Sequence, residues 1–187
     1  MLKTLACILL AGLAMPALAQ TTLSLPAEAR VDVQVIDSVT LDQATPNQAN
    51  VLLRPVERED SSATHRLPDY CLITADARLG DQGMRLSTKT VTCIEAEGDD
   101  RAIFSGELSA AAFERNGGFG LDVCTEQRDG QCMSATLDPS HTFQLSIGRD
   151  TEIAALDNPA EKINEQRRKT DGEDVANPIP SSPPDAE

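Results

Sequence analysis

The sequence predicts an all-β protein, a small antiparallel β-barrel or sandwich with a short C-terminal helix and a disordered tail. Short strand-like runs recur between residues 21 and 148, bounded by Pro, Gly, Asn or Asp, and no helical period connects them. Four of the five cysteines lie within this stretch. With no Trp, one Tyr and four Phe, the core must be mostly aliphatic and small, and disulfides would offset that weakness.

The first nineteen residues have the pattern of a cleaved secretory signal. Lys3 supplies a positive n-region, residues 5–15 an apolar h-region, and residues 17–19 (Ala-Leu-Ala) a small-x-small cleavage site. The apolar run is shorter than the ~20 residues that a membrane-spanning helix needs. We therefore expect residues 1–19 to be removed with Cys7, and the mature chain to start near Gln20 as a soluble protein of the periplasm.

The β domain, residues 20–150, contains seven expected strands. Residues 29–37 are expected to form the first strand, because apolar and polar side chains alternate there as in a strand with one solvent-exposed face. The seven runs are 29–37, 50–56, 70–75, 84–94, 101–108, 120–124 and 142–147. Residues 80–83 (Gly-Asp-Gln-Gly) and 98–100 (Gly-Asp-Asp) predict turns, and Asp129-Gly130 is a hairpin signal. Pro55 suggests a bulge or an edge strand.

Two segments favour helix over strand. Residues 108–115 (Leu-Ser-Ala-Ala-Ala-Phe-Glu-Arg) predict a turn or two of helix within the β domain. Residues 151–169 predict one charged helix, in which Glu165 and Lys169 form a favourable i,i+4 pair. Residues 170–187 are polar and rich in proline, which predicts a disordered tail.

The four cysteines outside the signal predict disulfides, because exported proteins fold in an oxidising compartment. Three pairings are open, and closure of the shortest loops favours Cys71–Cys93 and Cys124–Cys132. The first pair would face each other at the open end of a hairpin, and the second would flank the turn at 129–130 in the same way. A zinc site built from all four thiolates is the alternative, but the chain has no C-x-x-C pair and the spacings are irregular.

The charge of the chain restricts its partners. It carries 30 acidic and 16 basic residues, a formal net charge of −14 that loss of Lys3 makes one unit more negative. Such a chain repels nucleic-acid phosphate and anionic lipid. We expect no nucleic-acid partner and no membrane insertion of the mature chain, and a basic protein partner suits it better.

Nothing in the sequence assembles a catalytic, cofactor-binding or metal site. His65 and His141, the only histidines, sit in polar contexts that indicate solvated loops, and no Gly-x-Ser-x-Gly motif accompanies them. The acidic residues of 95–100 are typical of a solvent-exposed turn rather than of a catalytic pair. Residues 126–129 lack the spacing of oxygen ligands that an EF-hand calcium site needs. The glycine-rich residues 116–120 have no Lys-Ser/Thr after them, so a flexible loop is favoured over a phosphate site. The sequence therefore predicts a protein that is not an enzyme and has no cofactor.

Four segments, taken in order, resemble the periplasmic barrel of the TraB/TrbI family, the membrane-anchored scaffolds of conjugative type IV secretion core complexes. They are residues 25–27 (Leu-Pro-Ala), 51–54 (Val-Leu-Leu-Arg), 69–73 (Asp-Tyr-Cys-Leu-Ile) and 85–94, which ends in Val-Thr-Cys-Ile. Gly80-Asp81 stands where the family has a Gly-Asp turn, and the resemblance spans about residues 25–123. The chain departs from the family at Glu28, where the family has Gly, and we expect it to lack the membrane anchor and the pore helices.

The resemblance implies a non-enzymatic periplasmic scaffold or accessory protein of a conjugation or type IV secretion-like envelope assembly. Such a protein would act by contact with envelope or secretion-complex proteins, and a homo-oligomer joined through its strands fits this role. A stand-alone acidic periplasmic binding or inhibitor protein is the alternative. A small hydrolase would require a deep pocket with His65 or His141 beside a nucleophile.

Overall fold

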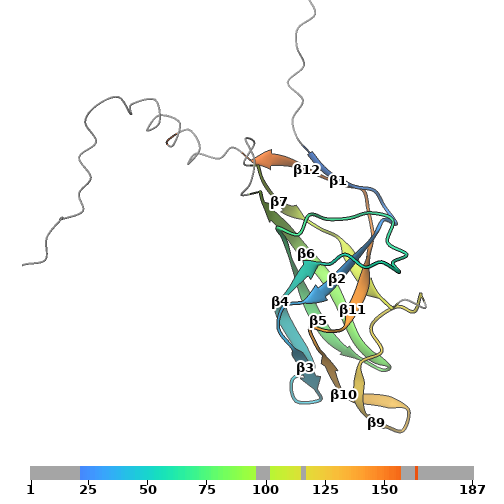
Figure 1. The fold of residues 1–187 in the computed structure, drawn as a ribbon. Helices are drawn as coiled ribbons and strands as arrows, with labels where there is room; N and C mark the ends of the chain where they lie inside the picture. Colours follow the sequence, from blue (N-terminus) through green and yellow to red (C-terminus); the bar gives the residue numbers. More distant parts are fainter. Residues whose placement is uncertain (1–21, 96–101, 115–116, 157–162, 164–187) are drawn as a thin grey trace, which may run out of the picture.

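The structure, a computed structural model, describes residues 22–95, 102–114, 117–156 and 163 (Figure 1). The expected signal, the turn at 98–100 and the tail at 170–187 lie outside these residues. The described chain is all-β, as predicted. Its strands are β1 (Thr22–Leu25), β2 (Arg30–Val35), β3 (Val39–Asp42), β4 (Asn47–Pro55), β5 (Cys71–Gly80), β6 (Gly83–Ile94), β7 (Ile103–Glu107), β8 (Ala110–Phe113), β9 (Cys124–Arg128), β10 (Gln131–Leu137), β11 (Thr142–Ile147) and β12 (Thr151–Leu156).

Six strands close into an antiparallel barrel. Their order is β6-β5-β4-β2-β11-β8, and β8 returns to pair with β6. From β6 the sheet continues outside the ring through β7, β12 and β1. Strands β3, β10 and β9 form a separate three-stranded sheet at the opposite end of the molecule from β1 and β12 (Figure 1). Of the two architectures left open by the sequence, the structure confirms the barrel.

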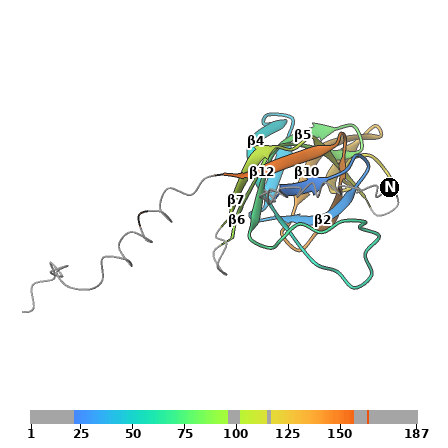
Figure 2. The same cartoon turned by 90° about the horizontal axis from the view of Figure 1, so that it is seen from above.

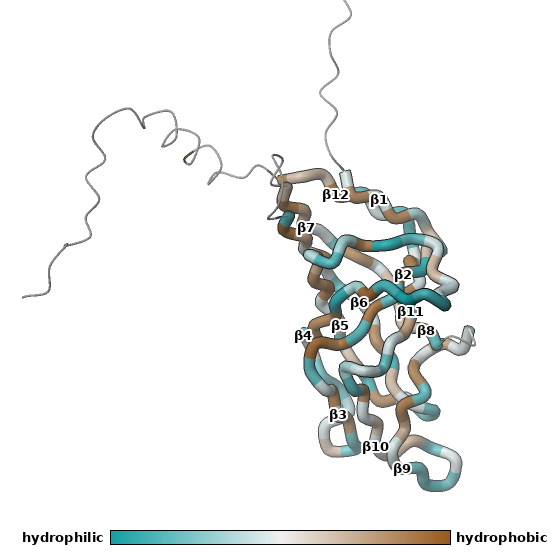
Figure 3. Tube along the Cα trace, in the orientation of Figure 1, coloured by the Kyte–Doolittle hydropathy of each residue, from teal (hydrophilic) through white to brown (hydrophobic). Residues whose placement is uncertain are grey.

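The barrel forms because its strands alternate apolar and polar residues (Figure 3). Leu53 in β4, Ile73 in β5 and Leu145 in β11 point into the ring and are completely buried, with alternate residues along the same strands more exposed. Alanine at 75 and 77 and phenylalanine at 143 complete a mixture of small and large inward side chains. Side chains therefore fill the barrel as a solid core.

A long connection between β4 and β5 covers the outer face of β2 and lies beside that strand in Figure 2. The backbone N–H groups of Thr64 and His65 both donate to the carbonyl of Arg30, at 3.1 Å. Beneath it, Gln144 Nε2 donates to Asp32 Oδ1 at 3.0 Å. Both of these side chains are 4 % exposed. The connection thereby buries β2 on both faces, which explains its nearly continuous burial.

Both predicted disulfides, Cys71–Cys93 and Cys124–Cys132, are present. Cys71 lies directly opposite Cys93 in the β5–β6 ladder, as expected for the open end of that hairpin. The second pair differs from the expectation, because Cys132 faces Gln127 rather than Cys124. Irregular register around Ser134 separates the two cysteines along the β9–β10 ladder, and the bridge spans this offset with a Cα–Cα distance of 5.8 Å.

The helix predictions are wrong for residues 108–114 and 151–156. Residues 110–113 form β8, which pairs with β11 along its whole length. Residues 151–156, the start of the predicted charged helix, form β12, which pairs with β1 and β7. Ile163 is helical, and the neighbouring residues of that expected helix lie outside the described part.

Smaller differences concern strand limits. Residues 120 and 121 form only isolated bridges, and the strand expected there starts at Cys124 as β9. Pro55 pairs regularly with Val33, while the irregularity of β4 lies between Gln48 and Val51. Strands β1, β3 and β10 were not among the expected runs. No helix in the described ranges is long and apolar enough to cross a membrane.

Two aspartates fix turns beside the small sheet. Backbone N–H donation from Thr45 is the main cause that holds the pKa of Asp42 below its ordinary value of 3.8. Backbone N–H donation from Ser140 lowers the pKa of Asp138 in the same way. Each carboxylate therefore stabilises its turn most strongly when it is ionised.

The barrel closes through a narrow seam between β6 and β8. The two strands share one backbone pair, Ser87 with Ala111. The register of β6 against β5 shifts by one residue at Lys89, and a bulge of this kind bends a strand. Beside it, Thr88 Oγ1 accepts from the N–H of Ala110 at 2.7 Å and donates to the carbonyl of Leu108. The Thr88 hydroxyl thus takes the place of some of the backbone hydrogen bonds that β6 and β8 do not make with each other.

We expect Thr88→Val to lower the free energy of unfolding by about 1–3 kcal/mol, because it leaves the Ala110 N–H and the Leu108 carbonyl without this partner. Denaturant unfolding measures the loss, and faster hydrogen exchange at Ala110 locates it. Thr88→Ser keeps the hydroxyl and is the matched control. A Thr88→Val variant as stable as the unchanged protein would show that the hydroxyl does not support the seam, and equal losses in the two variants would show that the methyl group contributes as much as the hydroxyl.

Candidate functional site

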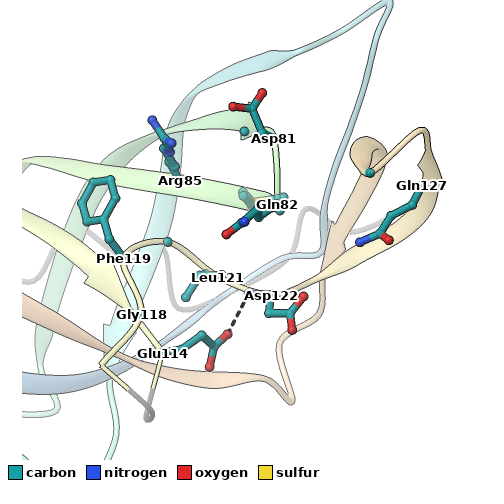
Figure 4. Close-up of a pocket in the computed structure, with 14 residues that line it drawn as sticks. Asp81, Gln82, Arg85, Glu114, Gly118, Phe119, Leu121, Asp122 and Gln127 are labelled. Atoms are coloured by element: carbon teal, nitrogen blue, oxygen red, sulfur yellow. Dashed lines mark hydrogen bonds between the residues drawn. The ribbon is translucent and has the colours of Figure 1, made fainter.

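An open groove with a volume of about 650 Å³ lies at the end of the barrel near β9 and β10 (Figure 4). Three segments that are far apart in the sequence form its walls. They are the β5–β6 turn at 80–85, residues 114 and 118–122 after β8, and the β9–β10 hairpin at 127 and 130.

Backbone hydrogen bonds hold these walls together. Met84 and Leu121 exchange a pair, with the Met84 N–H donating at 2.9 Å and the Leu121 N–H at 2.7 Å. The N–H of Cys132 donates to the carbonyl of Asp81 at 2.7 Å, which ties the β9–β10 hairpin to the β5–β6 turn. The groove is therefore built on main-chain contacts.

Gly83 makes the contact between the first two walls possible. Its φ is +152°, and a Cβ at this position would lie 2.1 Å from the carbonyl oxygen of Leu121. Real Cβ atoms do not approach an oxygen so closely. A glycine is consequently required where the turn meets residue 121.

One aromatic ring stands exposed at the rim. Phe119 is 59 % exposed, although the chain has only five aromatic residues. Its ring meets Phe113 edge-on at a centroid distance of 5.4 Å, and the Arg85 guanidinium carbon lies 5.5 Å from its centroid. Gly120, with φ +90°, donates its N–H to Ala112 at 3.0 Å and anchors the segment. The exposed ring is thus held in place.

The charged groups of the groove fall into two sets. Glu114 Oε1 accepts from the Asp122 N–H at 3.1 Å and lies 3.1 Å from His141 Nε2, so this carboxylate serves the fold. The carboxylates of Asp81 and Asp122 have no hydrogen bond or ion pair within the described part of the chain. Among the described residues that line the groove, the three carboxylates exceed the guanidinium of Arg85 by two negative charges.

One prediction for this region needs correction: His141, expected to be a solvated loop histidine, has a side chain that is 33 % exposed and contacts Glu114. The glycine-rich segment is a loop, as expected, in which Gly117 donates to the Glu114 carbonyl at 2.9 Å and Gly118 accepts from the Glu114 N–H at 3.0 Å. Asn116 lies outside the described residues.

The other candidates remain outside the groove. His65 lies in the connection between β4 and β5, with Nδ1 3.0 Å from Thr64 Oγ1, and does not line the groove. Of the acidic run at 95–100, only Glu95 is described. Among the described residues, no group of three or more His, Cys, Asp or Glu side chains could hold a metal ion.

Sequence reasoning did not identify the residues that define the groove, Asp81, Arg85, Phe119 and Asp122. The available signal was an aromatic residue between glycines in a chain with few aromatics. Comparison with known proteins adds no relative: no protein-family model matches the chain, and no curated protein matches it.

Proposed function

We propose that this protein is a non-enzymatic periplasmic scaffold or accessory protein. It acts by protein–protein contact in a conjugation or type IV secretion-like envelope assembly. The observation that carries the proposal is the closed barrel, whose interior is filled mostly by aliphatic side chains. Because the interior is filled, the surfaces offered to a partner are on the outside of the barrel and at its ends.

The positions of the segments that resemble the TraB/TrbI barrel support this proposal. Residues 51–54, 69–73 and 85–94 fall in or beside β4, β5 and β6, which are neighbours in the ring. The Cys71–Cys93 bridge joins two of these strands. These three segments therefore form one continuous part of the barrel wall, whereas Leu25 of the fourth segment lies in β1, outside the ring.

Two observations support export and a contact role. Paired cysteines are typical of proteins that fold in an oxidising compartment, which agrees with the signal predicted at 1–19. The described residues that line the groove include no Ser, Thr, Cys, His or Lys, and its ionisable groups are three carboxylates and one guanidinium. Binding suits this set of side chains better than turnover.

A stand-alone acidic binding or inhibitor protein is the second candidate. The acidic groove favours it, because a basic target could bind there without any larger assembly. Both candidates act by contact, and they differ in the identity and number of their partners.

Affinity purification of the full chain from its own host tests the proposal. Cells that carry a C-terminal tag are crosslinked, and the captured proteins are identified by mass spectrometry, with an unrelated tagged periplasmic protein as control. Recovery of several subunits of one envelope secretion apparatus is the expected result. Recovery of a single basic protein, released between about 0.1 M and 1 M NaCl as the Debye length falls from about 10 Å to 3 Å, would favour the second candidate. Recovery of no specific protein would overturn both.

A further inference from the structure

We propose that the groove binds an extended protein segment through a lysine or arginine side chain. Cations of the segment would pair with Asp81 and Asp122 on their separate walls, and an aliphatic stem would contact Phe119. This inference rests on the proposed function, because it assumes that the partner is a protein.

The construction of the groove is the first argument. Its walls are joined by the hydrogen-bonded pair of Met84 and Leu121 and by the bond from Cys132 to Asp81. Gly83 allows an approach that no other residue permits. A site whose walls are fixed before binding avoids the entropic cost of ordering them. An open groove of about 650 Å³ is large enough to hold several side chains.

The charges select the class of ligand. Asp81 and Asp122 come from two different walls and lie on opposite sides of Gln82 in Figure 4. Neither carboxylate has a partner in the described chain, whereas Glu114 is occupied by the Asp122 N–H and by His141. With an excess of two negative charges, the groove repels phosphate and attracts an ammonium or guanidinium group.

Phe119 explains why a long cationic side chain suits the groove better than a free metal ion. Its exposed ring offers apolar surface, and lysine and arginine bury their aliphatic stems on such surfaces while the charged end stays polar. Gln82 and Gln127 also line the groove, and their amides can donate to and accept from the main chain of a bound segment. An extended peptide supplies a cation for the carboxylates, an aliphatic stem for Phe119 and main-chain groups for the two glutamines.

Peptide titration of the full mature chain tests the inference. The probe is a capped hexapeptide with two lysines and one leucine, its twin carries glutamate in place of lysine, and a trimer of N-acetylglucosamine represents a glycan. Binding is followed by the NMR shifts of ¹⁵N-labelled protein at 81, 119 and 122. We expect only the lysine peptide to shift these signals, and its affinity to fall with added salt.

Charge-removing variants make the test specific. Asp81→Asn with Asp122→Asn should weaken binding of the lysine peptide about fivefold or more. The control, Asp60→Asn with Glu152→Gln, removes the same charge from exposed positions that do not line the groove and should change the affinity less than about twofold. Phe119→Ala should also weaken binding.

Several outcomes would overturn the inference. Equal binding of the lysine and glutamate peptides, binding of the glycan alone, absence of any shift, or equal losses in the two double variants would each do so. Failure of this site is distinguishable from failure of the proposed function. If the Asp81 and Asp122 double variant still captures the envelope partners as the unchanged protein does, the contact role stands and the groove is not its site.

Discussion

Replacement of Gly83 by alanine is expected to lower the free energy of unfolding by about 3 kcal/mol or more. The backbone at φ +152° is one that side chains rarely adopt, and a strained residue of this kind costs about 1–3 kcal/mol. The new Cβ would also lie 2.1 Å from the Leu121 carbonyl oxygen, so the hydrogen-bonded pair of Met84 and Leu121 must separate. Denaturant unfolding measures the loss, and hydrogen exchange at Leu121 reports the separation.

Gly130→Ala is the matched control. Its φ is +80°, but nothing lies within 4 Å of the added Cβ, so only the backbone strain remains. A loss of about 1 kcal/mol is expected there. If the two variants lose equal stability, the close approach to Leu121 is not what requires glycine at 83.

The second large effect concerns the buried disulfide. Cys71→Ala with Cys93→Ala should lower the free energy of unfolding by about 3–4 kcal/mol, because the bridge closes a loop of 22 residues in the unfolded chain. Both half-cystines are 1 % exposed, so removal of their sulfur atoms also leaves unfilled space in the core. Unfolding in denaturant under oxidising conditions measures the difference.

The second bridge provides the comparison. Cys124→Ala with Cys132→Ala opens a loop of only 8 residues, and Cys124 is partly exposed, so about 2.5 kcal/mol is expected. The structure requires this order of effects. A larger loss of unfolding free energy from the Cys124 and Cys132 pair would contradict this order. It would show that the small sheet contributes more to stability than the Cys71–Cys93 hairpin does.

The sequence was most informative where local pattern and burial agree. The strand at 142–147 has the expected limits, because turns bound it and its core-facing residues are large and apolar. The pairing of Cys71 with Cys93 was predictable because a glycine-bounded turn connects two strands of similar length, which places their far ends together. These are properties of one hairpin and need no knowledge of the rest of the chain.

Local reasoning failed where a distant strand decides the conformation. Ala110, Ala111 and Ala112 have high helix propensity, but β11 supplies a ladder partner for each of them. In β12, Thr151 and Ile153 are buried while Glu152 and Ala154 are exposed. That period of two was present in the sequence, but the charged residues that follow suggested a helix.

The sequence could mark Phe119 between glycines as unusual, but it could not predict the groove that surrounds this residue. Its walls are separated by up to 50 residues, from Gly80 to Gly130, and they meet through backbone bonds that carry no sequence signature. The composition could indicate an acidic surface, but not that Asp81 and Asp122 would share one cavity with the exposed ring of Phe119.

The pairing of the first strands with the last has a consequence for how the chain folds. Thr22 in β1 faces Ala154 in β12, and Val31 in β2 faces Leu145 in β11. An N-terminal piece lacking β11 therefore has neither a closed ring nor a covered core, and contacts so distant in sequence form slowly. The ring can therefore close only once the whole segment up to residue 147 is available to pair, wherever the chain folds.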